Sequence, residues 1–76
     1  MLMRKIRPGD ELTPRERDVA NLIVEGLTNQ EISEELDISR HTVKFHIVNL
    51  IIKLDCRNRT DAAVKHARAI DRRAAV

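Results

Sequence analysis

The side chains best suited to bind a metal or act as a nucleophile are three histidines and one cysteine: His41, His46, His66 and Cys56. His41 and His46 are five positions apart, which places them about 140° from each other on a helix. They therefore do not converge on one ion as histidines four positions apart would. The sequence also lacks paired carboxylates, a glycine-rich phosphate loop and a nucleophile motif. We expect no catalysis, no cofactor and no metal site.

The distribution of charge instead indicates a polyanionic partner. Residues 10–37 hold nine acidic and two basic residues, whereas residues 38–60 hold five basic residues and one acidic residue. The whole chain carries a net charge of only +2. A basic half beside an acidic half is typical of a domain that turns one face to nucleic acid. The alternative is an internally compensated dipole that has no partner.

Size and composition limit the class of protein further. A chain of 76 residues forms one domain. Its single cysteine cannot form a disulfide within the chain, which fits a reducing compartment and a cytoplasmic localisation. No stretch approaches the roughly 20 apolar residues that a membrane span needs. Residues 1–8 lack the apolar core of a signal peptide.

Capping patterns and apolar stripes predict four helices, near residues 14–25, 28–36, 40–54 and 59–71, and no strand. Thr13 and Thr28 are each followed three positions later by glutamate, the capping-box pattern of a helix start. Ser39 and Asn58 can cap the other two helices. The second and third helices, joined at residues 37–39, form a helix-turn-helix pattern. The expected fold is an all-α four-helix bundle in which the third helix is the recognition helix.

The chain divides into an arm, a domain and a tail. Residues 1–11 are basic and contain the pair Pro8-Gly9, so we expect a linker or loose arm there. Residues 12–72 form the predicted domain, and residues 73–76 a frayed tail. Within the third helix, an inner apolar stripe recurs at helical spacing and predicts the core-facing side; it consists of Val43, Ile47, Leu50 and Leu54.

Several linked motifs resemble the LuxR/FixJ-type (GerE-like) helix-turn-helix DNA-binding domain of bacterial transcriptional regulators. They are LTPRE at 12–16, GLTNQEI at 26–32, LDIS at 36–39, TVKFH at 42–46, KL at 53–54 and NRTDA at 58–62. The similarity runs in register from residue 12 to about residue 70. The sigma-factor region that binds the promoter −35 element opens similarly, but it lacks the fourth-helix motif.

The resemblance implies a sequence-specific transcriptional regulator whose partner is double-stranded DNA, bound with the third helix in the major groove. In the family this domain is usually the C-terminal output domain of a two-domain response regulator, although stand-alone members exist. Further implied partners are an upstream sensor domain and RNA polymerase. The residues at base-contacting positions are Lys44, Phe45 and Val48. Those at or near phosphate-contacting positions are Thr28, Asn29, Arg40, Thr42, His46 and Lys53.

The outward face of the third helix departs from the family because it is apolar. Phe45, Val48 and Ile52 cluster opposite the inner stripe, beside His41 and Asn49, and the family usually has a polar or basic residue at Val48. Apolar side chains can contact the C5-methyl group of thymine, so we interpret Phe45 and Val48 as DNA contacts and Ile52 as a packing residue. Alternatively, this stripe packs on a second core layer, a partner protein or a neighbouring chain.

Two other functions therefore stay open: a protein-interaction module that has the helix-turn-helix fold, and a sigma-like promoter reader.

The composition of the fourth helix predicts a dimer. Its apolar residues span more than the face that one core requires, which predicts a weak homodimer through Ala63, Val64, Ala67 and Ile70. The alternative is an exposed, alanine-rich helix that has no partner.

Overall fold

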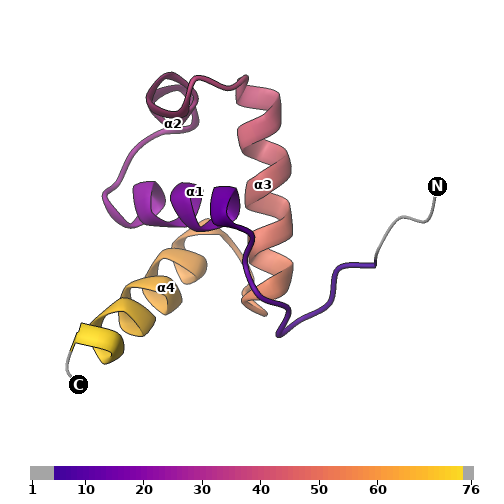
Figure 1. The fold of residues 1–76 in the computed structure, drawn as a ribbon, viewed down its shortest axis with the longest axis vertical. Helices are drawn as coiled ribbons and strands as arrows, with labels where there is room; N and C mark the ends of the chain where they lie inside the picture. The colour runs from indigo at the N-terminus through magenta and orange to yellow at the C-terminus, as the bar shows by residue number, and fades with distance from the viewer. Residues whose placement is uncertain (1–4, 75–76) are drawn as a thin grey trace.

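The structure, a computed structural model, describes residues 5–74 and contains four helices and no strand in that range. They are α1 (Pro14–Val24), α2 (Asn29–Leu36), α3 (Arg40–Lys53) and α4 (Arg59–Ala74) (Figure 1). This confirms the predicted all-α fold. Helix α4 extends three residues beyond the predicted end, because its last turn contains Arg72 and Arg73, whose charges suit the negative end of a helix. The predicted arm and tail include residues 1–4 and 75–76, which lie outside the described residues.

The helix starts form as the capping patterns predict. The hydroxyl of Thr13 accepts the Glu16 N–H at 3.1 Å, and the Glu16 carboxylate accepts the Thr13 N–H at 2.9 Å. Thr28 and Glu31 form the same pair at the start of α2. Ser39 caps α3 by accepting the Thr42 N–H at 3.0 Å. These local bonds satisfy amides that the helices leave without intrahelical partners.

A tight turn sets the angle between α2 and α3. Asp37 adopts a left-handed conformation at φ 54°, which aspartate tolerates better than most residues, and the Ile38 N–H donates to the Ser33 carbonyl at 3.0 Å. Ser33 itself is buried, and its hydroxyl donates to the Gln30 carbonyl at 2.7 Å. The two helices are therefore held in a helix-turn-helix arrangement.

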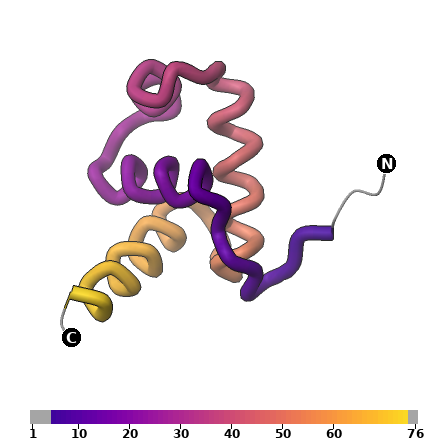
Figure 2. The backbone as a smooth tube through the Cα atoms, viewed as in Figure 1, coloured from indigo at the N-terminus to yellow at the C-terminus, as the bar shows by residue number. Residues whose placement is uncertain are grey.

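One core joins all four helices. Helix α1 packs against α3 and α4, and α2 packs against α3, so α1 lies between the other helices in Figure 2. The inner stripe of α3 is buried, with Leu54 at its edge, as predicted. Because this stripe faces the core, the opposite side of α3 stays free. The buried apolar residues are Val19, Ala20, Ile23, Ile32, Val43, Ile47, Leu50 and Ala62.

A buried histidine lies where α1 meets α4. His66 Nε2 lies 2.7 Å from the amide oxygen of Asn21. Burial, together with the positive charges of Arg17 and Arg73, lowers the pKa of His66 below its usual 6.5. The ring is therefore neutral at neutral pH and serves as a core residue of this interface.

The arm is attached to the end of α3. Its turn at Pro8 and Gly9 places Gly9 at φ 90°, a region that glycine adopts without steric cost. There the Gly9 N–H donates to the Lys53 carbonyl at 2.9 Å. The Asp10 N–H donates to the Arg7 carbonyl at 3.2 Å, and the Asp10 carboxylate accepts the Arg7 N–H at 3.1 Å. The Gly9–Lys53 bond attaches the arm to α3, and the two bonds between Arg7 and Asp10 form a turn within the arm.

Candidate nucleic-acid interface

Residues 40–48 of α3 present all three predicted base-contacting side chains to solvent. Phe45 is 60% exposed and Val48 is 56% exposed, although both are large and apolar. Lys44, next to Phe45 in the chain, is exposed as well. A helix that buries one stripe and exposes an adjoining group of one cation and two apolar side chains has the composition that base edges in a major groove require.

Ile52 continues this apolar stripe toward the end of α3. We expected it to pack, yet it is 38% exposed and is not part of the core of this chain. Two turns of helix separate it from Phe45, so it lies near the end of α3. Ile52 is therefore outside the core of this chain, and its packing on a partner protein or a neighbouring chain stays a prediction.

The predicted phosphate contacts at the start of α2 are held in place by α4. The Arg59 guanidinium donates to the Asn29 side-chain oxygen and to the Leu27 carbonyl. This leaves the Asn29 NH₂ group, and the O–H of the capping Thr28, as donors toward solvent. Sequence spacing does not indicate this role of Arg59, because its partners lie about thirty positions earlier in the chain.

The start of α3 supplies the next two predicted phosphate contacts. Arg40 is exposed, and Thr42 is half-buried with its hydroxyl 2.9 Å from the Ser39 hydroxyl. The first-turn amides of α2 and α3 add partial positive charge at both helix starts. Backbone amides of this kind bind phosphate oxygens, so both helix starts suit a DNA backbone.

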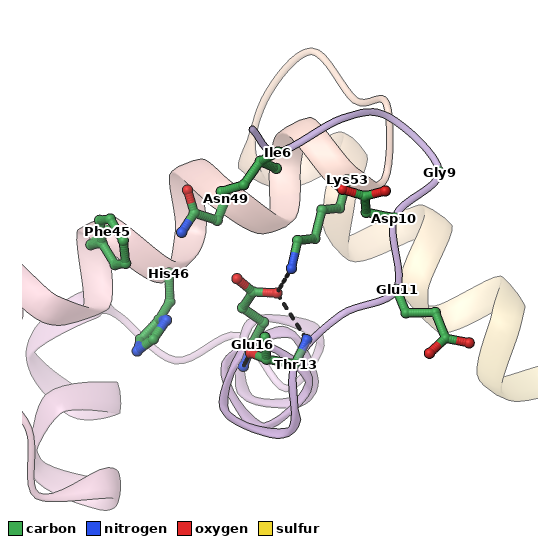
Figure 3. A pocket seen from close by; sticks show the side chains of 10 residues that line it. All are labelled: Ile6, Gly9, Asp10, Glu11, Thr13, Glu16, Phe45, His46, Asn49 and Lys53. Carbon is green, nitrogen blue, oxygen red and sulfur yellow. Dashed lines mark hydrogen bonds and ion pairs between the residues drawn. The ribbon is translucent and has the colours of Figure 1, made fainter. Parts of the chain in front are cut away.

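Lys53 occupies a different environment from the one expected of a phosphate contact. Its Nζ lies 2.6 Å from Glu16 Oε1, and the two side chains are only 9% and 4% exposed (Figure 3). Glu16 thus completes the cap of α1 and pairs with α3 at once. The ammonium is directed at α1 rather than at solvent, so the structure gives the predicted phosphate contact of Lys53 no support.

The Glu16 carboxylate is ionised in this arrangement. Burial acts to raise the pKa of Glu16, but the Lys53 ammonium and the Thr13 N–H outweigh it and hold the pKa below its usual 4.5. An ionised carboxylate facing an ammonium stays paired at neutral pH. The Glu16–Lys53 ion pair therefore links α1 and α3 at neutral pH.

His46 and Asn49 lie on the same side of α3 as Lys53. All three line a cavity of about 630 Å³ between α3, the start of α1 and the arm (Figure 3). Asn49 is only 8% exposed, although the helical wheel placed it on the outward face. His46 is half-buried, and its Nδ1 has no hydrogen-bond partner among the described residues. The structure thus sets His46 beside the arm rather than with Lys44.

Most of the cations in the basic half of the chain have partners within the protein. Lys53 pairs with Glu16, Arg59 holds α2, and Arg57 lies 3.9 Å from Asp61. Beyond that segment, Lys65 donates to the carbonyls of residues 54 and 55 at 3.0 Å each, which caps α3. The exposed cations of α3 itself are consequently Arg40 and Lys44.

The predicted dimer residues form one strip on α4. Val64 and Ile70 are 43% and 41% exposed, and Ala63 and Ala67 are half-buried. This strip borders the side of α4 on which Ala62 and His66 face the core. The apolar surface of α4 is therefore wider than its contact with α1 requires.

Residues 5–74 hold no group of three histidine, cysteine, aspartate or glutamate side chains placed to bind a metal ion. Within the same residues, no helix is long and apolar enough to cross a membrane. Cys56 is half-buried against the core, as expected of a small packing residue, and burial raises the pKa of its thiol.

Comparison with known proteins shows which family has these features. Residues 10–66 match the family "Bacterial regulatory proteins, luxR family". The chain is 54% identical over 57 residues to the transcriptional regulatory protein LiaR of Bacillus subtilis, and 45% identical over 58 residues to the nitrate/nitrite response regulator NarL of Escherichia coli K12. These alignments cover 75% and 76% of this chain, but only 27% of each relative.

A solved structure of the transcription factor GerE agrees with this result. It matches with a TM-score of 0.70 and 36% sequence identity, over 87% of this chain and 91% of that one. The likeness to GerE therefore extends over nearly all of both chains, whereas this chain spans about a quarter of the length of LiaR and NarL. The chain belongs to the luxR family of bacterial regulatory proteins, and its four helices form a helix-turn-helix DNA-binding domain of that family.

Proposed function

We propose that this protein regulates transcription by binding a specific duplex DNA sequence with residues 40–48 of α3 in the major groove. The observation that carries the proposal is the joint exposure of Lys44, Phe45 and Val48 on a helix whose other side is core. Lys44 is suited to donate to the O6 and N7 acceptors of guanine, and Phe45 and Val48 to contact thymine methyl groups. The luxR family is a family of regulators rather than of enzymes.

Phosphate contacts fix such a domain on the duplex. We assign them to Thr28 and Asn29 at the start of α2, and to Arg40 and Thr42 at the start of α3. His46 is a weaker candidate because it is half-buried. Lys53 is removed from this set, since its ammonium is paired with Glu16.

Selection of bound fragments from a random duplex library tests the proposal and finds the site. Replacing Lys44 by Ala should then relax the preference at one base pair, at a cost of about 1–3 kcal/mol. Arg68→Ala, which removes one exposed charge from α4, is the control and should leave base preference unchanged. If no sequence is enriched, or if Lys44→Ala binds specific and random DNA like the parent, the proposal fails.

The exposed apolar stripe of Phe45, Val48 and Ile52 favours a second candidate, a protein-interaction module that has this fold. An exposed apolar patch often marks a protein interface. The same selection separates the two, because an interaction module enriches no DNA sequence. The exposed cations Arg40 and Lys44 beside the stripe favour the first candidate.

We also propose a weak homodimer through the strip of Ala63, Val64, Ala67 and Ile70 on α4. Two-fold symmetry sets the same strip on both chains, and a dimer that places two recognition helices roughly 34 Å apart favours an inverted repeat. Replacing Ala67 by Glu sets like charges across the axis. Cooperative binding at a two-half-site operator should fall, whereas half-site affinity should persist. Unchanged binding to the full site contradicts the dimer.

The chain spans about a quarter of the length of two relatives, one named a transcriptional regulatory protein and the other a response regulator. On that basis we propose that the domain acts as the output domain of a response regulator in the bacterial cytoplasm, at the nucleoid. An upstream sensor domain and RNA polymerase are the corresponding protein partners.

A further inference from the structure

We propose that residues 5–11 of the arm are a second DNA-binding element, in which Lys5 and Arg7 bind backbone phosphates beside the groove that α3 enters. This inference rests on the proposed function, because it requires α3 to lie in DNA. It extends that function by adding phosphate contacts outside the helix-turn-helix.

The docking of the arm determines where these two cations lie. The Gly9 N–H is bonded to the carbonyl of Lys53, the last residue of α3. From there toward the N-terminus, Ile6 lines the same cavity as Asn49 (Figure 3). Ile6 is half-buried and shares the cavity with Phe45. Lys5 and Arg7, on either side of Ile6, are both exposed.

The arm also lies on the correct side of the molecule. In Figure 1 it extends beyond α3 on the side away from α2 and α4. Lys5 lies four positions before Gly9, and an extended chain spans at most roughly 3.3 Å per residue, or about 13 Å in all. The major groove is about 12 Å wide. An arm anchored at the end of α3 therefore reaches the phosphates at the edge of the same groove.

The charge of the arm suits phosphate because its nearby carboxylates are directed elsewhere. Asp10 accepts the backbone N–H of Arg7, and Glu16 is paired with Lys53. Glu11 points away from α3 in the close-up (Figure 3). An ammonium and a guanidinium bind phosphate as a point charge and as a bidentate donor, respectively.

Helix α3 alone presents few exposed cations to DNA, so cations of the arm would add substantially to phosphate binding. Arg40 and Lys44 are the exposed cations of α3, whereas Lys53 and Arg59 have internal partners. Lys5 and Arg7 would therefore double the number of exposed cations around the recognition helix. Because phosphate contacts supply most non-specific affinity, the arm should strengthen binding to every sequence alike.

The test compares two double variants that each remove two exposed positive charges. Lys5→Ala with Arg7→Ala changes the arm, and Arg68→Ala with Arg72→Ala changes α4 as the matched control. If the arm makes two phosphate contacts, the log–log salt slope of duplex binding should drop by about 1.8, at roughly 0.9 per contact. The ratio of the parent's DNA affinity to that of the arm variant should then fall about twelvefold between 50 and 200 mM salt. Specific and random duplexes should weaken equally.

A third variant tests the docking itself. Gly9→Pro removes the N–H that bonds Lys53 and cannot adopt φ 90°, yet it keeps both cations. Part of the salt slope should be lost, while the melting temperature of the domain stays near that of the parent because the arm lies outside the core.

The outcomes separate this inference from the proposed function. An arm variant whose affinity and salt slope equal those of the α4 control overturns the inference, as does a Gly9→Pro variant that keeps the full slope. Neither result affects the proposed function as long as Lys44→Ala still relaxes base preference. If the parent shows no salt-dependent DNA binding, the proposed function itself fails.

Discussion

The two parts of α3, residues 40–48 and 49–53, place similar residues in different environments. In residues 40–48, Lys44, Phe45 and Val48 are exposed, and Phe45 makes an edge-to-face contact with His46 at 5.8 Å between ring centroids. In residues 49–53, Asn49 and Lys53 lie against the cavity between the arm and the start of α1, and the lysine is paired with a buried carboxylate. Two lysines nine positions apart on one helix thus differ in environment, and the position of α1 is the cause.

This difference shows how the recognition face is held. The Glu16–Lys53 pair and the Gly9–Lys53 backbone bond both act at the last turn of α3. The start of the helix is held instead by Ser39 and the turn at Asp37. With both ends fixed to other elements, the free face between them can be apolar and exposed without collapsing onto the core.

The largest effect expected from this comparison is on stability. Lys53→Ala leaves the Glu16 carboxylate buried without its cation, which should cost about 3 kcal/mol in the free energy of unfolding, the lower end for a broken buried pair. Lys44→Ala, the matched control among the exposed residues of α3, should change the free energy of unfolding by less than about 0.5 kcal/mol. Urea denaturation measures both. Equal stabilities, with DNA binding weakened by Lys53→Ala, would restore Lys53 as a phosphate contact.

A pH dependence should accompany the pair, with a smaller effect. The pKa of Glu16 is lowered in the folded protein, so its contribution is present above the usual 4.5 and is lost as the pH falls through the folded pKa. Glu16→Gln should therefore be less stable than the parent by about 2 kcal/mol at neutral pH. The two should converge in acid.

His66 also destabilises the fold on acidification, because its pKa is lowered below 6.5. It is present in both proteins, so its effect cancels in their difference. Thermal melts from pH 7 to pH 3 provide the measurement. A stability difference that stays constant across this range would show that Glu16 carries no charge in the pair.

The smallest expected effect is on base discrimination by the exposed residues 40–48 of α3. Phe45→Ala should reduce discrimination of thymine from uracil at one position by about 1 kcal/mol, the value of roughly one methyl group removed from water. Its unfolding free energy should hardly change, because the ring is 60% exposed. Binding to duplexes in which single thymines are replaced by uracil measures the discrimination. If Phe45→Ala binds normally but unfolds readily, Phe45 is a packing residue.

Local patterns were reliable where neighbouring residues decide the structure. Three capping hydroxyls, at Thr13, Thr28 and Ser39, start their helices as predicted. The inner stripe of α3 faces the core because its spacing matches the helical repeat. The exposure of Phe45 and Val48 followed from the same wheel.

The differences arose where two distant segments meet. A helical wheel assigned Asn49 to the outward face, because a wheel contains no neighbouring elements, and the family resemblance assigned Lys53 to a phosphate contact. The arm and α1 bury Asn49 and pair Lys53 across 37 positions of sequence.

The amino-acid sequence by itself determined the four helices, their starts, the core stripe and the family, because capping and periodicity act over three or four residues. Only the tertiary structure decided which cations remain free for DNA. Charge pairing depends on a few ångströms between segments that are far apart in the chain, and sequence spacing does not encode that distance. Lys44 and Lys53 are the same residue type on the same helix, and their environments differ because Glu16 of α1 pairs with Lys53.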